Sequence, residues 1–217
     1  MEDVLELYEE PYDAQRPVVC FDETSKQLIE ETRVPLPAQP AEKGHQGHPG
    51  QRERYDYEYQ RNGTRNLFMH CEPKAGWRHV EVTEQGTMTD LAQQMKWLAE
   101  EAYPSAEIIG VVLDNLNTHR PASLYEVFEA AEARRILRRL EFHYTPKHGS
   151  WLNMAEIELS VLNGQCLDRR SGEERQLKAE VQAWQAARNA AQVKINWRFT
   201  CHDARTKLHR LYPATST

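Results

Sequence analysis

Three acidic residues stand where carboxylates could share metal ions. Asp22 follows the apolar residues 18–21, Asp114 follows the apolar run 108–113, and Glu156 lies where a segment rich in turn-forming residues becomes a helix. Two acids from strand ends and one from a helix are what a two-metal phosphoryl-transfer site needs, because ions about 4 Å apart act on both the attacking and the leaving oxygen. Magnesium prefers such oxygen ligands. A single Asp at a strand end is more often a turn former, so this pattern alone leaves the assignment open.

The helix offers two candidates for the third acid. Glu156 and Glu158 are two residues apart and so point about 200° away from one another on a helix. Glu156 shares its stripe with the polar residues Asn153, Ser160 and Asn163, although Leu152 and Leu159 flank it. Glu158 is bordered by Met154, Ala155, Val161 and Leu162. A hydrated ion favours the polar stripe, but polar stripes usually just face solvent. Spacing therefore leaves the choice open.

Charge is divided unevenly along the chain. The net charge of the 217 residues is −6, yet residues 1–133 carry 12 Lys+Arg against 25 Asp+Glu, and residues 134–217 carry 15 against 8. A basic third fits a protein that meets phosphates on one side, although charges scattered over solvated helices give the same count. The sequence has no apolar run of membrane-spanning length, and its first ten residues are too acidic for a signal peptide. The four cysteines lack zinc-site spacing, and we expect reduced, mostly buried thiols in an intracellular protein.

Hydrophobic periodicity predicts the elements that must position these acids. We expect a mixed sheet with helices on its faces, because a strand meander is followed by alternating helices and strands. The predicted strands are 16–22, 67–71, 77–82, 108–113 and 140–144, with a hairpin turn at 73–76 and a further turn at Asn62-Gly63. The predicted helices are 2–10, 88–103, 122–139, 152–164, 173–193 and 201–211, the last beginning with a capping box at Thr200 and Asp203.

A long insertion interrupts the meander. Proline and glycine make residues 35–51 an irregular loop, where His45 and His48 have metal-ligand spacing but no rigid scaffold. In residues 52–61, three tyrosines alternate with acids, so a strand would place the rings on one face. With Arg54 and Arg61 beside them, the rings could stack on unpaired bases, or they could pack on the core as in any strand.

Three blocks of this sequence carry a resemblance. Phe21-Asp22-Glu23, the run from Leu113 to His119 and the run from Thr145 to Ser160 are similar to the signature blocks of the DDE transposases, especially the bacterial insertion-sequence relatives of the mariner group. The resemblance extends from about residue 4 to residue 213. It implies an α/β fold with a ribonuclease-H-like mixed sheet and helices on both faces. The implied divisions are a helix and linker at 1–15, a catalytic domain at 16–165 with an irregular insertion at 31–63, and a helical extension at 166–217.

The resemblance also implies an activity and site residues. Asp22 and Asp114 match the first two catalytic acids, and the family pattern Leu-Asn-x-x-Glu falls on residues 152–156 and makes Glu156 the third. These three would hold two Mg²⁺ or Mn²⁺ ions, cut DNA at element ends and join the freed 3′-hydroxyl to target DNA. The residues expected to contact DNA are His119, Lys147, His148, Trp151, Arg54 and Arg61. For His119, Lys147 and His148, the alternative is a place in a surface loop without a role in binding. For Trp151, a core position at the start of its helix is favoured.

Departures from the family pattern bear on the partners. Between Asp114 and Glu156 lie 41 residues, more than in the mariner proteins, and we attribute the excess to the helix at 122–139. Relatives place a helix-turn-helix region ahead of the catalytic domain, and only about fifteen residues precede the first strand here. We therefore expect end recognition to come from a partner chain or an absent N-terminal region, with a homodimer on DNA at the bacterial nucleoid in the cytoplasm and no membrane partner. The alternatives are a structure-selective nuclease of the same fold and an inactive DNA-binding or regulatory remnant.

Overall fold

The computed structural model describes residues 1–40, 50–115 and 120–212. Its centre is a five-stranded sheet of order β3-β2-β1-β4-β5. The first three strands form an antiparallel meander, and the last two run parallel to β1. Their bounds are β1 Val18–Glu31, β2 Tyr59–Glu72, β3 Trp77–Thr83, β4 Ile109–Leu113 and β5 Leu140–Tyr144. The predicted mixed sheet is confirmed, including the hairpin between β2 and β3.

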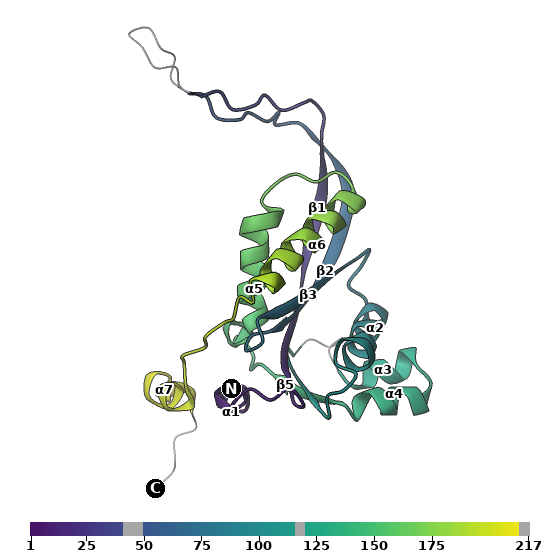
Figure 1. Cartoon of the computed structure of the whole chain (residues 1–217), viewed down its shortest axis with the longest axis vertical. Helices are drawn as coiled ribbons and strands as arrows, with labels where there is room; N and C mark the ends of the chain where they lie inside the picture. The colour runs from purple at the N-terminus through teal and green to yellow at the C-terminus, as the bar shows by residue number, and fades with distance from the viewer. Residues whose placement is uncertain (41–49, 116–119, 213–217) are drawn as a thin grey trace.

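Helices cover both faces of the sheet (Figure 1). Successive strand residues point to opposite faces, so Cys20 belongs to one core cluster and Phe21 to the other. The Cys20 face is covered by α1 Glu2–Glu9, α5 Met154–Leu162, α6 Glu174–Ala190 and α7 Cys201–Lys207. The Phe21 face is covered by α2 Met88–Trp97 and its π-helical continuation Leu98–Ala102, by α3 Ala122–Val127 and by α4 Ala130–Leu137. The predicted capping box at Thr200 and Asp203 is present at the start of α7.

The predicted single helix at 122–139 is wrong, because the chain breaks into α3 and α4. Phe128 and Glu129 between them have extended backbones. One continuous helix would set Leu124 and Ile136 about 120° apart, since each residue turns the helix by about 100°. The break lets both side chains reach the same core, where each is about 1% exposed.

The first hairpin extends well beyond the packed sheet. We predicted that the first strand ends at Asp22, but β1 continues to Glu31, and β2 begins inside the insertion at Tyr59. Beyond these strands two isolated bridges, Leu36–Arg54 and Gln39–Gln51, keep the two chain segments paired. Figure 1 shows the result as a narrow arm that leaves the body past α5 and α6.

Two local predictions in this arm are wrong. The Asn62-Gly63 pair is not a turn: it lies inside β2, where Gly63 has φ +92° and the pairing with β1 shifts by one residue between Gln27 and Ile29. This is the geometry of a β-bulge, which needs a residue that tolerates positive φ. Residues 52–58 are not a strand either, and Tyr57 is 85% exposed. Tyr55 and Tyr59 instead lie beside the Arg170 guanidinium, 6.0 and 5.2 Å from its carbon to the ring centroids.

All four cysteines are free and buried, as the sequence predicts. Within the described ranges, the search for a helix that is long and apolar enough to cross a membrane finds none.

Candidate active site

Asp22 and Asp114 come together through the register of two parallel strands. Val18 of β1 is opposite Gly110 of β4, and the same offset places Cys20 opposite Val112. Asp22 and Asp114 each lie two residues beyond this last pair, so the two strands deliver both aspartates to the same end of their paired region. Neighbouring strands are about 4.8 Å apart, and residues in register point to the same face. Asp22 is two residues from Cys20 on the same strand, so its side chain lies on the face of the sheet that α5 covers.

A buried asparagine joins Asp22 to that helix. Asn153, which is 0% exposed, donates both hydrogens of its side-chain amide, one to the Phe21 carbonyl at 2.8 Å and one to Asp22 Oδ2 at 3.1 Å. Its amide oxygen accepts from the Ala155 backbone N–H at 3.1 Å and so caps α5. The other oxygen of Asp22 accepts from the Glu23 N–H at 2.8 Å. The carboxylate is therefore held through both oxygens, directly beside the beginning of α5.

Glu156 lies in the first turn of α5 and is exposed. It follows the cap by three residues, so it points to nearly the same side of the helix as Asn153, which faces Asp22. The predicted third acid thus lies at the helix end that meets the two strand-end acids. Glu158 points the other way, and its side chain is 1% exposed.

Glu158 is the centre of a buried ionic cluster with Arg78 and Arg188. Arg78, from β3, is fully buried and donates from Nη2 to Glu158 Oε1 at 3.0 Å. Arg188, from α6, donates to both carboxylate oxygens, at 2.8 and 3.0 Å. Glu158 therefore ties α5 to β3 and α6, and its oxygens are directed away from the candidate site.

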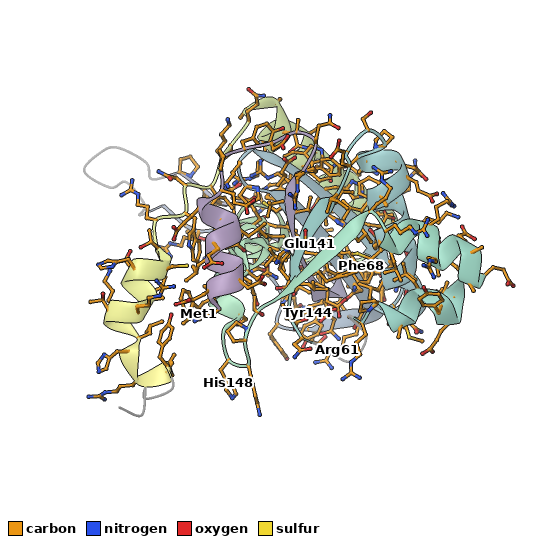
Figure 2. All side chains as sticks on the ribbon, turned by 90° about the horizontal axis from the view of Figure 1, so that it is seen from below. Met1, Arg61, Phe68, Glu141, Tyr144 and His148 are labelled. Carbon is orange, nitrogen blue, oxygen red and sulfur yellow. The ribbon has the colours of Figure 1, made fainter. Side chains whose placement is uncertain are left out.

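Lys147 and His148 lie in the loop that follows β5. The Thr145 N–H donates to the Leu113 carbonyl at 2.9 Å, which holds the start of this loop beside Asp114. Both side chains are exposed, and His148 has a left-handed backbone with φ +64°. Figure 2 shows His148 at the outer end of the loop, pointing away from the packed side chains. The structure places both residues at the edge of the site, where they are open to a large substrate.

Trp151 is not the core residue that we favoured. It lies in a short 3-10 turn before α5, and 46% of it is exposed. Its ring stacks beside Trp197, with centroids 6.2 Å apart, and meets Phe199 edge-on at 5.4 Å. The segment after α6 thus supplies two aromatic side chains to the rim of the site.

Two of the predicted DNA-contact residues lie far from Asp22. Arg61 is opposite Ile29, seven strand residues from Asp22, which corresponds to about 23 Å. Arg54 lies further out, bridged to Leu36. Both therefore belong to the arm, and His119 lies outside the described residues.

The donor set fits a hard divalent cation. Asp22, Asp114 and Glu156 offer only oxygen atoms as ligands, which such a cation prefers. Cys20, two residues before Asp22, is no competing ligand, because burial raises the pKa of its thiol to about 11. Across the described ranges, no three His, Cys, Asp or Glu side chains are already clustered closely enough to hold a metal.

A pocket of about 280 Å³ lies elsewhere, lined by residues 10–13 together with Arg16, Val18, Glu72 and Lys74. Val18 is the first residue of β1 and lies four residues before Asp22, so this pocket is at the start of the strand and Asp22 lies further along it. None of the predicted site residues lines it.

Comparison with known proteins bears on this arrangement. Residues 17–178 match the family model described as DDE superfamily endonuclease. The chain belongs to this family. The DDE chain is also similar to a solved structure, the Mos1 strand transfer complex, with a TM-score of 0.50 and 14% sequence identity over 89% of this chain. It covers 58% of the Mos1 chain, and at this identity the likeness shows the fold. The comparison with curated proteins gives no match.

The sequence does not predict the side chains that contact Asp22 and Glu158. Asn153 is part of the pattern at 152–156, but its bond to Asp22 spans 131 residues of chain, and no local signal reports such a contact. Arg78 and Arg188 are likewise 80 and 30 residues from Glu158. The apolar neighbours of Glu158 were the one available hint that this acid is buried and needs partners.

Proposed function

We propose that this DDE endonuclease is the catalytic domain of a DNA transposase, which cleaves DNA at element ends and joins the freed 3′-hydroxyl to target DNA. The observation that carries the proposal is the hydrogen bond from Asn153 to Asp22, because Asn153 caps the helix that carries Glu156. The pairing of β1 with β4, which ends two residues before Asp22 and Asp114, supports it. Family membership over residues 17–178 and the fold shared with the Mos1 chain support it.

In this proposal the three acids have defined tasks. Asp22, Asp114 and Glu156 hold two Mg²⁺ or Mn²⁺ ions, which when bound activate the attacking oxygen and stabilise the leaving oxygen of a phosphodiester. Asn153 and the Glu23 N–H fix the orientation of the Asp22 carboxylate. Glu156 is exposed and can adjust as the substrate binds.

DNA contacts are proposed for two separate surfaces. Lys147, His148 and Trp151 rim the site, where the lysine can hold a phosphate and the exposed indole can stack on a base. Arg54 and Arg61 would meet DNA only where it extends along the arm. His119 stays a proposed DNA contact on the family pattern alone.

Further partners follow from the same proposal. Because this chain covers 58% of the Mos1 chain, we propose that a helix-turn-helix region, on another chain or on an N-terminal segment, recognises the element ends. A homodimer on DNA at the bacterial nucleoid, in the cytoplasm, completes the proposal.

The test is cleavage and joining by the purified chain. Supercoiled plasmid and duplexes that carry element ends are incubated with Mg²⁺, Mn²⁺ or EDTA. We expect metal-dependent nicking and joined products, both lost in Asp22→Asn. Asp90→Asn is a matched control, because Asp90 caps α2 on the opposite face of the sheet.

The outcomes separate the candidates. Nicking without joined products, even with element-end duplexes, would indicate the structure-selective nuclease. DNA binding without any metal-dependent cleavage would indicate a regulatory remnant, and nicking that persists in Asp22→Asn would refute the site.

A further inference from the structure

Asn153 joins the first acid to the helix that carries the third acid. The side-chain amide of Asn153 makes three hydrogen bonds. Its NH₂ group donates two of them to β1, and its oxygen accepts the third from the α5 backbone. The opposite amide orientation would set its oxygen against two other oxygens, so the contacts define which end donates. A helix cap alone needs only the oxygen. The two donated bonds to β1 are therefore additional to capping.

We infer that Asn153 is a positioning residue for the metal-binding carboxylates: it holds the Asp22 carboxylate in place and sets its distance to the helix that carries Glu156. The inference rests on the proposed function. Residues that hydrogen-bond to a ligating carboxylate fix its orientation, and their loss typically lowers metal affinity or activity about 10–100-fold.

The geometry explains why a side chain with both a donor and an acceptor is needed. Asn153 is fully buried, and its neighbours Leu152 and Met154 are buried as well, so water does not replace a lost bond easily. The Leu152 carbonyl accepts from the Tyr8 hydroxyl at 2.8 Å, which fixes the turn just before the cap. The amide is thus presented to Asp22 from a backbone that is itself held in place.

Serine separates the two roles of this residue. Asn153→Ser keeps an oxygen that can cap α5, because Ser is as good an N-cap as Asn, but it has no amide to reach Asp22. Asn153→Ala removes both roles. Thr200→Ala is the control for a lost cap alone, since Thr200 caps α7 and has no contact with the acids.

The main measurement is the affinity for Mn²⁺, which electron paramagnetic resonance gives from the signal of the free ion. The rate of plasmid cleavage is measured alongside it. For Asn153→Ser we expect Mn²⁺ affinity and cleavage each to fall at least about 10-fold. Plasmid binding in EDTA should stay at the parent level. Thr200→Ala should bind Mn²⁺ like the parent.

A double-mutant cycle keeps the test decisive if Asn153→Ser loses stability. When two residues act through one interaction, the second substitution adds little to the first. Thermal unfolding of the parent, both single variants and Asn153→Ser with Asp22→Asn should therefore show clear non-additivity. Asn153→Ser with parental Mn²⁺ affinity, or additive effects in the cycle, would overturn the inference and reduce Asn153 to a cap. Absence of Mn²⁺ binding and cleavage in the parent would instead overturn the proposed function.

Discussion

Glu156 and Glu158 provide the sharpest test, because the structure predicts opposite consequences for the same chemical change. Glu156 is exposed at the start of α5, and Glu158 is 1% exposed between Arg78 and Arg188. We expect Glu156→Gln to abolish metal-dependent cleavage with little loss of stability, and Glu158→Gln to keep the chemistry in a less stable protein.

The size of the stability effect follows from the buried cluster. Replacing the Glu158 carboxylate by a neutral amide leaves Arg78, which is 0% exposed, without its counter-charge. Breaking a buried ion pair in this way costs about 3–5 kcal/mol. In a chain of this length, each kcal/mol lowers the melting temperature by about 2–4 °C, so we expect a loss of roughly 6–20 °C. An exposed substitution such as Glu156→Gln should stay within about 0.5 kcal/mol.

The assay pairs thermal unfolding by circular dichroism with plasmid cleavage well below the melting temperature of the weaker variant. Since both variants make the same Glu to Gln change in one helix, each is the matched control of the other. The reasoning fails if Glu156→Gln cleaves like the parent while Glu158→Gln is inactive at an unchanged melting temperature. That result would make Glu158 the third acid.

Three further predictions can be checked separately. Asp22→Asn and Asp114→Asn should each abolish cleavage with the fold intact by circular dichroism, and cleavage within a few-fold of the parent would contradict this. Burial lowers the pKa of His70 from 6.5 to about 3, so the unfolded state takes up a proton first and stability should fall as pH drops below 6.5. Between pH 6.5 and pH 4.5, the free energy of unfolding measured in urea should therefore fall by about 2–3 kcal/mol less in His70→Phe than in the parent. Binding to random duplex should be weak and steeply salt-dependent, with a shallower slope in Lys147→Ala. Affinity that does not change with salt would contradict this.

Local pattern predicted the elements that position the site, because their signals lie in contiguous residues. β4 and β5 are uninterrupted apolar or alternating runs, and the capping box at Thr200 needs only a four-residue motif. Tertiary packing decided the elements that were missed. The break at Phe128 lets Leu124 and Ile136 share a core, and no propensity in that Ala- and Arg-rich segment signals it.

For the candidate site, the sequence indicated residue types but not their contacts. Spacing left the choice between Glu156 and Glu158 open. The structure separates the two acids, because Glu156 is exposed and Glu158 is buried against two arginines. The assignment of catalysis to Asp22, Asp114 and Glu156 stays a prediction. Asn153 was read only as a pattern residue, because its partner on β1 is fixed by strand register and helix packing together.

The region needed to hold α5 in place extends beyond the residues that match the family model. That match ends at residue 178, inside α6, whereas Arg188 and the core residues Val181 and Trp184 lie after it. Without Arg188, Glu158 would keep only the Arg78 contact, and the orientation of α5 would lose two of its hydrogen bonds. Because Glu156 and Asn153 are on the same helix, the second half of α6 stabilises the geometry at Asp22 without touching it. The packing that holds α5 therefore includes α6 in full, beyond the residues that match the family model.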